Sequence, residues 1–522
     1  MGKYLVKRIL RGMVSIVLVV TVAMILIYSL MDRVQVFSAD STFGRQAYNN
    51  RDEYSYIKWE QYGYLDYVPY ADWLNELARN GEIDEETRSA AVNFGRKAED
   101  DSEIVAEYVA RFTEYYESQG YTIIRLNAIM NGRKVINGGQ QKLFATKDLP
   151  LAGRILNYFT SILDIDNIHK AAEVEGERGL TFTLHDPAYG GEKFSPAIIG
   201  NGTEHKYLLY FNDQFPYIHQ NLLTIRLGLS YSVNKDIDVF TTMTQSQGSY
   251  IKSTVTYPTG FVEESADDLH TALYSQGTRT ASALNEARFN DDYTVVDTVK
   301  GSTSKMGFSF TLGIISTILA YCLGLPLGLL MALRKDKLMD KLGNIYIIFI
   351  SAVPSLAYIF MVKGIGGALG FPTIFNIESG NWTMYALPII SLSMPTIASL
   401  MKWSRRYIVD QHSSDYVKFA RSGGLTEREI FTGHILKNAI IPITHGIPGS
   451  LLFAMTGALI TEKVYVVPGT GGLLTEAINK FDNSVIVGIV LFYAILSVAA
   501  SILGDVFMSM VDPRISFSTK DR

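Results

Sequence analysis

Six stretches free of Asp, Glu, Lys and Arg constrain this chain more than any other feature. They cover residues 12–31, 306–333, 342–362, 379–401, 438–461 and 483–504. A helix needs about 20 predominantly apolar residues to cross the hydrocarbon core of a bilayer. We therefore predict a mainly α membrane protein with six transmembrane helices, the first formed with the N-terminal segment 1–31.

The first stretch has two interpretations, a cleaved signal peptide or a permanent anchor. Its apolar run exceeds the usual signal-peptide core of about 7–15 residues, and no clear Ala-x-Ala cleavage site follows it. We expect an anchor.

Lysine and arginine are distributed unevenly over the loops. Segments 1–11, 334–341, 402–437 and 505–522 hold 18 of them, whereas the short loops 363–378 and 462–482 hold 3. Because cytoplasmic loops carry the excess of Lys and Arg, both termini are expected in the cytoplasm. Residues 32–305 are then extracellular, and the chain is a multi-pass protein of the plasma membrane.

The long segment 32–305 carries 26 Lys and Arg and 39 Asp and Glu, a net charge of −13, although the whole chain has −5. It is too rich in apolar and aromatic residues for a disordered linker. Apolar residues at helical intervals predict helices between about 71 and 119. Clusters of β-formers between turn residues predict strands at 121–126, 180–184 and 207–211. We expect a mixed α/β extracellular domain inserted between helices 1 and 2.

The end of this domain contains an apolar stretch, 215–232, interrupted by His219 and Arg226. We predict a helix lying at the membrane interface, and not a seventh span. A helix in the core of the extracellular domain is nearly as plausible.

The loop 402–437, between the fourth and fifth stretches, carries the sharpest signature. Tyr416 to Ala420 predict a short helix that Gly423 and Gly424 end, since glycine readily adopts positive φ. Thr426 and Glu429 then have the spacing of a capping box, which begins a second helix. The pattern indicates a rigid helix–Gly–helix protrusion against which a soluble motor can push.

Four segments together resemble the oligopeptide/dipeptide permeases of binding-protein-dependent ABC importers. The loop matches their coupling motif at Asp415, Tyr416, Ala420, Arg421, Gly424, Leu425, His434, Leu436, Asn438, Ala439 and Pro442. The later family motifs match at Glu462, Pro468, Gly469, Gly471, Asp505, Asp512, Pro513 and Arg514. The basic start KYLVKRILRG also fits. The large insert is similar to that of the AmiC-type branch of Gram-positive bacteria, while Phe419 and Gly423 depart from the usual polar and basic residues.

The resemblance implies a type I ABC importer permease whose core is 306–522 and whose loop 402–437 docks on an ATPase. It implies a second homologous permease, two ABC ATPases, a lipid-anchored peptide-binding protein outside the cell, and the bilayer as partners. We expect no enzyme activity and no cofactor in this chain, because it contains neither a Walker A motif nor an LSGGQ signature. ATP and Mg would be bound by the partner subunits.

For several residues, both a functional role and a purely structural role are consistent with the sequence. His434 either acts in coupling or hydrogen-bonds a neighbouring helix end, and His445 either lines a peptide cavity or reaches interfacial water. Substrate-contacting residues are otherwise not predicted, and we nominate no catalytic or metal-binding residues. Gly324 and Gly328 have a spacing that favours close helix packing.

Other functions stay open. The same architecture carrying a nickel chelate or a sugar is the first alternative, and a membrane receptor is a distant one. A receptor would not require the helix–Gly–helix loop. A secondary transporter is disfavoured because we expect no carboxylate in the interior of a span. Nucleic-acid binding is not indicated, since no basic face is suggested by the net charge.

Overall fold

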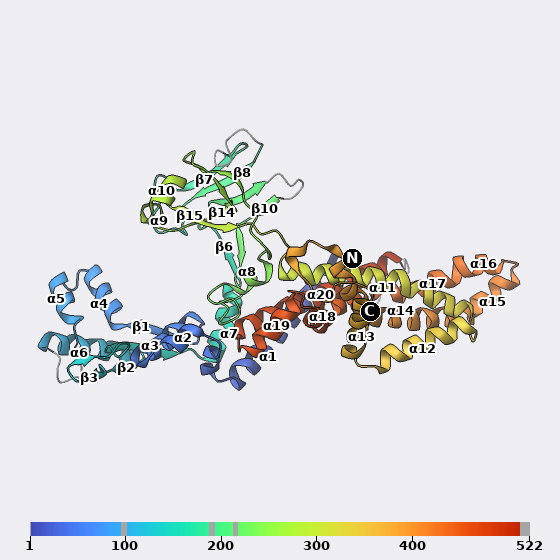
Figure 1. Ribbon diagram of the computed structural model, residues 1–522, viewed down its shortest axis with the longest axis horizontal. Helices are drawn as coiled ribbons and strands as arrows, with labels where there is room; N and C mark the ends of the chain where they lie inside the picture. Colours follow the sequence, from blue (N-terminus) through green and yellow to red (C-terminus); the bar gives the residue numbers. More distant parts are fainter. Residues whose placement is uncertain (1, 95–101, 187–193, 212–217, 512–522) are drawn as a thin grey trace.

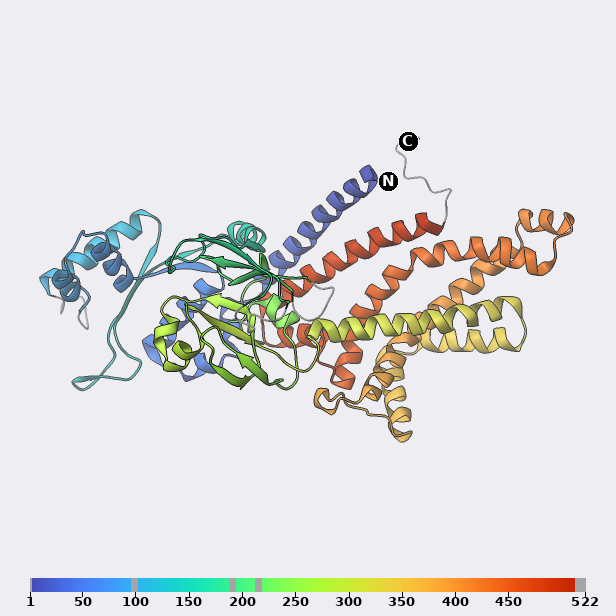
Figure 2. The same ribbon diagram turned by 90° about the horizontal axis from the view of Figure 1, so that it is seen from above.

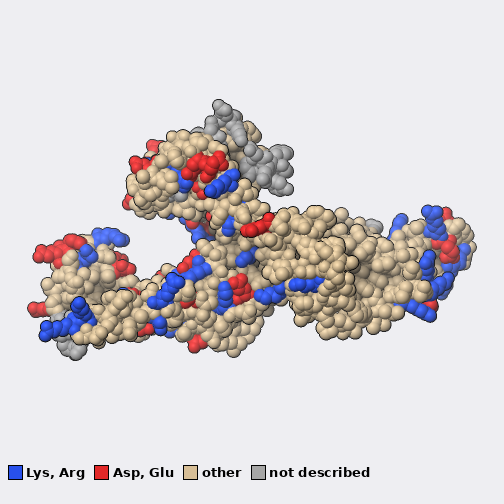
Figure 3. All heavy atoms as spheres, viewed as in Figure 1, with Lys and Arg blue, Asp and Glu red and all other residues tan. Residues whose placement is uncertain are grey.

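The computed structural model describes residues 2–94, 102–186, 194–211 and 218–511. The molecule is elongated, with a helical core toward one end and two lobes built from the inserted segment at the other (Figure 1). A band almost without charged residues covers much of the helical core in the view of Figure 3, and charged side chains gather on both sides of it. This distribution suits a core surrounded by lipid.

Four helical segments are long and apolar enough to cross a membrane. They are Tyr4–Leu30 within α1 (Gly2–Leu30), α11 (Lys305–Leu333), Trp382–His412 with α14 (Ala386–His412), and α20 (Asn483–Val511). Two bent pairs pass the same test: α12 (Leu338–Ala352) with α13 (Ser355–Ala368), and Glu427–His445 with α18 (Ile447–Tyr465). The described chain thus holds four candidate spans, or six if each bent pair is one span.

The predicted third span, 342–362, contains the sharper of the two bends. Helices α12 and α13 meet at 115° across Val353 and Pro354. Proline has no N–H to donate and its ring clashes with the preceding turn, so it begins a helix more readily than it continues one. Pro354 accordingly stands at the N-cap of α13.

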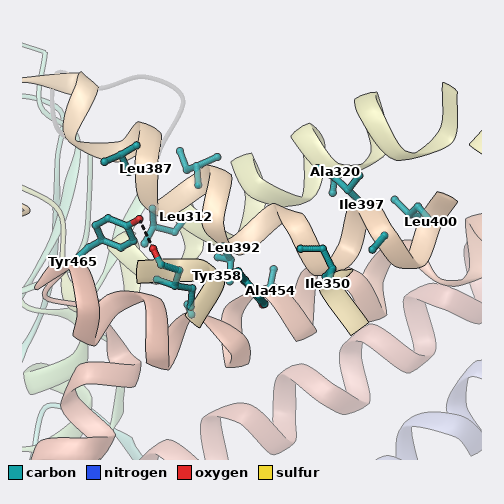
Figure 4. Packing of buried hydrophobic residues seen from close by; sticks show 14 of the residues in the cluster. Leu312, Ala320, Ile350, Tyr358, Leu387, Leu392, Ile397, Leu400, Ala454 and Tyr465 are labelled. Atoms are coloured by element: carbon teal, nitrogen blue, oxygen red, sulfur yellow. Dashed lines mark hydrogen bonds between the residues drawn. The ribbon is translucent and has the colours of Figure 1, made fainter. Parts of the chain in front are cut away.

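Glycines bring α11 and α14 close together, as the sequence spacing predicted. A Cβ on Gly324 would lie 2.8 Å from Leu400 Cβ, and one on Gly328 would lie 2.9 Å from the Met401 carbonyl oxygen. Larger residues at these positions would separate the helices. Figure 4 shows Leu312, Ala320, Ile397 and Leu400 among the buried residues of this core.

The first and last long helices are neighbours although they lie at opposite ends of the sequence. α1 runs beside α20 in Figure 2. The Tyr4 hydroxyl donates to Asp505 Oδ2 at 3.0 Å, and Arg8 Nε lies 3.1 Å from the same oxygen. Asp505, predicted as a family-motif residue, therefore ties the start of α1 to α20.

The inserted segment is a mixture of helices and strands. The helices of its first lobe are η1 (Arg33–Phe37), α2 (Ser41–Arg45), α3 (Tyr48–Gln61), α4 (Tyr70–Arg79), α5 (Glu85–Ala91) and α6 (Glu103–Ser118). They surround an antiparallel sheet in which β5 (Lys142–Asp148) lies between β1 (Leu65–Pro69) and β2 (Thr122–Leu126). A small hairpin is formed by β3 (Met130–Asn131) and β4 (Lys134–Val135). The helices predicted between about 71 and 119 and the strand predicted at 121–126 are confirmed.

The second lobe is mainly strands. Its four-stranded antiparallel sheet has the order β10 (Ile218–Gln220), β9 (Tyr207–Phe211), β8 (Ala197–Asn201) and β7 (Gly179–Thr183). Three further strand pairs are β11 (Leu223–Ile225) with β6 (Leu163–Ile165), β12 (Ser253–Thr256) with β13 (Val262–Ser265), and β14 (Asp267–Tyr274) with β15 (Tyr293–Thr298). Two short helices, α9 (Thr278–Ala281) and α10 (Ala283–Arg288), complete this lobe. The strands predicted at 180–184 and 207–211 are confirmed within a residue.

The helix predicted over 215–232 is wrong in its described part. Residues Ile218–Gln220 form β10 and extend the sheet beside β9, and Leu223–Ile225 form β11, which pairs with β6. β9 is the preceding strand and β6 lies far earlier in the sequence, and pairing with these strands overrides the local apolar pattern. Residues 215–217 lie outside the described chain.

The two lobes are joined to the core by α7 (Leu151–Ser161) and α8 (Val239–Thr244), and through the start of α20. Buried Asp482 accepts hydrogen bonds from the Ser230 hydroxyl at 2.7 Å and from the Ser232 and Val233 amides at 3.0 Å. The next residue, Asn483, donates to the Tyr64 hydroxyl at 3.0 Å. The inserted domain is thus fastened to α20 by buried polar contacts.

Candidate functional site

The loop that the sequence singled out forms the end of the helical core far from the inserted lobes (Figure 1). After α14 the chain turns through α15 (Asp415–Ser422) and α16 (Glu427–Ile430), and then passes through η6 (Phe431–Ile435), a short π-helix, into α17 (Leu436–His445). Basic and acidic side chains gather over this end in Figure 3. The segment 415–430 is called the knob below.

The turn of the knob has the predicted chemistry. Gly423 caps α15 with φ −76°, and Gly424 has φ +85°, a conformation that side chains with a Cβ rarely adopt. Thr426 and Glu429 form the capping box at the start of α16. The two helices are also braced by Arg421, whose Nε lies 2.6 Å from Glu427 Oε1.

A small apolar cluster holds the knob on the helices beneath it. Its buried members are Ile408, Val417, Ile430, Ile435 and Ala439, with Tyr416 and Ala420 packed against them. The Tyr416 hydroxyl donates to Gln411 Oε1 at 2.7 Å. These contacts make the knob a compact body continuous with both α14 and α17.

Two apolar side chains of the knob are exposed to solvent. Phe419 is 79% exposed and Leu425 is 40% exposed. Asp415 is also exposed and pairs with Lys418 at 2.8 Å, a surface ion pair of little energetic weight. In the sequence, Phe419 was assigned to the predicted short helix and was noticed as a departure from the family pattern.

A second cluster of motif residues lies at the opposite end of the core, where α18 turns into α19 (Thr470–Asn479). Glu462 is 1% exposed. Its Oε1 accepts the Ser309 hydroxyl at 2.6 Å, and its Oε2 accepts the Gly471 and Gly472 amides at 2.9 and 3.1 Å. The carboxylate thereby satisfies free amides in the first turn of α19.

The glycines of this loop permit that approach. A Cβ on Gly469 would lie 2.2 Å from the Glu462 carboxyl carbon, and one on Gly471 would lie 2.6 Å from Leu459 Cα. The Thr470 amide donates to Ser309 Oγ at 2.9 Å, so Ser309 joins α11 to the same network. Ser309 was missed in the sequence, where it is one small residue in an apolar run.

The helix that contains the end of the fifth apolar stretch extends beyond that stretch. The sequence placed its end at residue 461, before a charged residue, but α18 continues through Glu462 to Tyr465. Glu462, one of the last four residues of α18, is thus a buried carboxylate within this helix. A buried carboxylate is tolerated here because amides and a hydroxyl surround it.

Comparison with known proteins agrees with these motifs. The family model "binding-protein-dependent transport system inner membrane component" matches residues 324–517. The oligopeptide transport system permease protein AmiC of Streptococcus pneumoniae is 33% identical over 527 residues, covering 100% of this chain and 99% of that protein. This chain belongs to the same permease family.

Two further matches are partial. The dipeptide transport system permease protein DppB of Bacillus subtilis is 28% identical over 217 residues, covering 41% of this chain and 68% of that protein. A structure titled "Inward facing conformations of the MetNI methionine ABC transporter" matches with a TM-score of 0.32 and 14% identity, over 40% of this chain and 94% of that chain. The AmiC match covers the whole chain and so includes the inserted domain.

The remaining predicted residues of the permease are placed as follows. His434 is exposed, and its ring centroid lies 6.5 Å from that of Tyr416. Leu436 and Asn438 are half-buried in α17, and Pro442 is exposed in the same helix. Pro468 is half-buried and precedes the Gly469 turn. Asp512, Pro513 and Arg514 lie outside the described residues.

His445 ends α17 at the bend before α18. Its Nδ1 would lie 3.1 Å from a Cβ on Gly504, so the ring packs closely on α20. The structure thus brings His445 into contact with a neighbouring helix. Within the described ranges, no group of three or more His, Cys, Asp or Glu is placed to hold a metal ion.

Proposed function

We propose that this permease imports oligopeptides as one of two membrane subunits of an ATP-driven transporter. The observation that carries the proposal is the AmiC match, which runs through the whole chain, insert included. The cargo named for that relative and for the dipeptide permease is peptide in both cases. The proposed partners are a second homologous permease, two ATPases, and a lipid-anchored peptide-binding protein.

The proposed topology has six spans, with both bent pairs counted as one span each. Both termini and the knob are cytoplasmic, and residues 32–305 are extracellular. The 18 to 3 distribution of Lys and Arg over the loops supports this orientation. The protein is a multi-pass protein of the bacterial plasma membrane.

The knob is the proposed coupling element, seated in a groove of an ATPase subunit. ATP and Mg belong to that subunit, and this chain contributes no phosphate chemistry. The residues expected to act in coupling are those of the family motif in 415–442 together with Phe419, whose exposed ring suits a protein-covered contact.

A single helical path leads from the knob to the other end of the core. It runs from α16 through η6 and α17, bends by 40° at Gly446, and continues in α18 to Glu462. Glu462 then holds the first turn of α19. Displacement of the knob by the ATPase would move these helices as rigid segments about the bend at Gly446. This motion would change access at both ends of the cavity between the two permeases.

The test is ATP hydrolysis by the purified complex in liposomes. Oligopeptides presented with the binding protein are expected to stimulate hydrolysis and to accumulate inside. A complex that is stimulated by a nickel chelate or a sugar but by no peptide would contradict the peptide assignment and leave the ATPase coupling intact.

A further inference from the structure

A cavity of about 590 Å³ lies at the end of the helical core opposite the knob. Its lining comes from the start of α11, the end of α18 and the length of α19. In Figure 1, α19 lies where the helical core meets the inserted lobes. Sites for small molecules usually have volumes of about 300–1,000 Å³, so this cavity is large enough to hold the end of a peptide.

Three lysines from three helices meet at this cavity. Lys305 is the first residue of α11, Lys463 lies in the last turn of α18, and Lys480 caps the end of α19. The loops 363–378 and 462–482 hold only 3 Lys and Arg between them, and two of these are Lys463 and Lys480. Because basic residues are scarce in the loops on this side, the excess of cations in cytoplasmic loops does not explain their convergence.

Two of the three lysines have no carboxylate partner. Lys480 Nζ lies 2.7 Å from Glu476 Oε1. Among the residues that the structure describes, the ammonium groups of Lys305 and Lys463 form neither an ion pair nor a hydrogen bond. Glu462 also lines the cavity, but it is buried and its oxygens already accept the three hydrogen bonds given above. The cavity therefore has two cations available to an anion from outside the chain.

The lysines can be reached from solvent. Lys463 is exposed and Lys305 is half-buried, and the side chain of Lys480 is 37% exposed. A carboxylate that enters the cavity can thus replace the water around these ammonium groups with charge-assisted hydrogen bonds.

Apolar side chains complete the lining, and one of them is in a strained conformation. Val466 has φ +61° and ψ 38°, and it is 59% exposed. A β-branched residue is rarely found in this left-handed region, and strain of this kind is concentrated at functional sites. Val467, Pro468 and Leu473 lie beside it in the cavity wall. The cavity thus combines cations with an exposed apolar surface.

We propose that this cavity binds the C-terminal carboxylate of the peptide that the transporter imports, which rests on the peptide-import function and the topology proposed above. Lys463 and Lys305 donate to the carboxylate oxygens, and Val466 contacts the last side chain of the peptide. Linear peptides with a free C-terminus share this carboxylate whatever their sequence. The site would therefore hold cargoes of varied sequence by one common group.

The test compares two peptides of one sequence, one with a free C-terminal carboxylate and one with a C-terminal amide. Uptake of each into liposomes is measured with the purified complex and its binding protein. The ratio of the two uptake rates is expected to fall about tenfold in Lys463→Gln, the effect of one hydrogen bond to a charged group. Because the same binding protein presents both peptides to every variant, its own preference cancels when the ratios are compared.

Two further variants sharpen the comparison. Lys463→Arg keeps the positive charge and is expected to retain the wild-type ratio. Lys252→Gln removes an exposed lysine of the inserted domain that does not line the cavity, and it should also leave the ratio unchanged. Lys305→Gln is expected to lower the ratio as Lys463→Gln does. Since Lys463 is exposed, its variant decides the question even if Lys305→Gln fails to assemble.

An unchanged ratio in Lys463→Gln would overturn the proposal, whether or not overall uptake falls. Slower uptake of both peptides together with weaker binding of the peptide-free binding protein would assign Lys463 to a contact with that protein. A ratio that follows the anionic lipid content of the liposomes would assign it to a lipid headgroup. In each case the peptide-import function would stand, whereas a complex that takes up neither peptide would overturn both proposals.

Discussion

Arg405 and Asp340 form a two-point ion pair between α14 and α12. Arg405 Nε lies 2.6 Å from Asp340 Oδ1, and Nη2 lies 2.7 Å from Oδ2. Asp340 is 2% exposed and also accepts the Asp336 amide at 2.9 Å. Because α14 leads directly into α15, the pair fastens the base of the knob to the start of the bent α12–α13 unit.

Breaking this pair is expected to weaken the transporter and its coupling. Arg405→Ala leaves a buried carboxylate without its cation, a loss of about 3 kcal/mol in stability. Thermal unfolding of the purified complex should shift downward, and peptide uptake should fall. Arg406→Ala is the matched control, because Arg406 is 63% exposed and lies 3.8 Å from an equally exposed Asp410. Equal effects of the two substitutions would rule out a special role for Arg405.

The turn of the knob contains two adjacent glycines, of which only Gly424 has a positive φ. Gly424→Val places a β-branched residue at φ +85°, which costs about 1–3 kcal/mol although the space around it is open. We expect uptake to be abolished with membrane insertion intact. Gly423→Ala, at φ −76° with only ordinary contacts, should transport normally. Normal uptake by Gly424→Val would count heavily against the coupling role of the knob.

The Glu462 cluster provides another adjacent pair. Gly471→Ala would force a Cβ to within 2.6 Å of the Leu459 backbone, whereas a Cβ on Gly472 would meet nothing closer than 3.7 Å. The first substitution is expected to lower thermal stability by about 1–3 kcal/mol, the usual range for overpacking, and the second to have little effect. The comparison is made by thermal unfolding in detergent, and indistinguishable curves would refute the close approach.

Glu462 itself is predicted to organise α19. Glu462→Ala removes the acceptor of the Ser309 hydroxyl and of two backbone amides. Faster hydrogen exchange is then expected in the first turn of α19, because its amides lose their partner. Unchanged exchange at Gly471 and Gly472 would show that other groups satisfy these amides.

Local chemistry was predictable from the sequence, and long-range contacts were not. The knob follows from glycine conformation and the Thr426 capping box, which involve residues close in sequence. The membrane-spanning helices were likewise predicted from apolar residues that are contiguous in the sequence. Pro354 cannot continue a helix, but the 115° angle between α12 and α13 depends on the residues that pack around the bend.

The contacts of charged residues inside the core were not predicted from the sequence. Glu462 was taken as the border of a span, because its partners Ser309, Gly471 and Gly472 come from other elements. The Arg405–Asp340 pair joins residues 65 positions apart and carries no sequence signal. Strand pairing of 218–220 and 223–225 likewise depends on partners outside the local pattern.

The most direct test of the account is a crosslink from the tip of the knob in the assembled transporter. Cys322, the single native cysteine, is first replaced by serine, and Phe419→Cys then places a thiol at the most exposed apolar position of the knob. A thiol-reactive photocrosslinker at 419 is predicted to capture an ATPase subunit, with a yield that changes when ATP is added. The same probe at Leu284→Cys, in the inserted domain, should not capture the ATPase. A probe at 419 that labels only lipid, or reacts with no protein in the working complex, would contradict the proposed coupling.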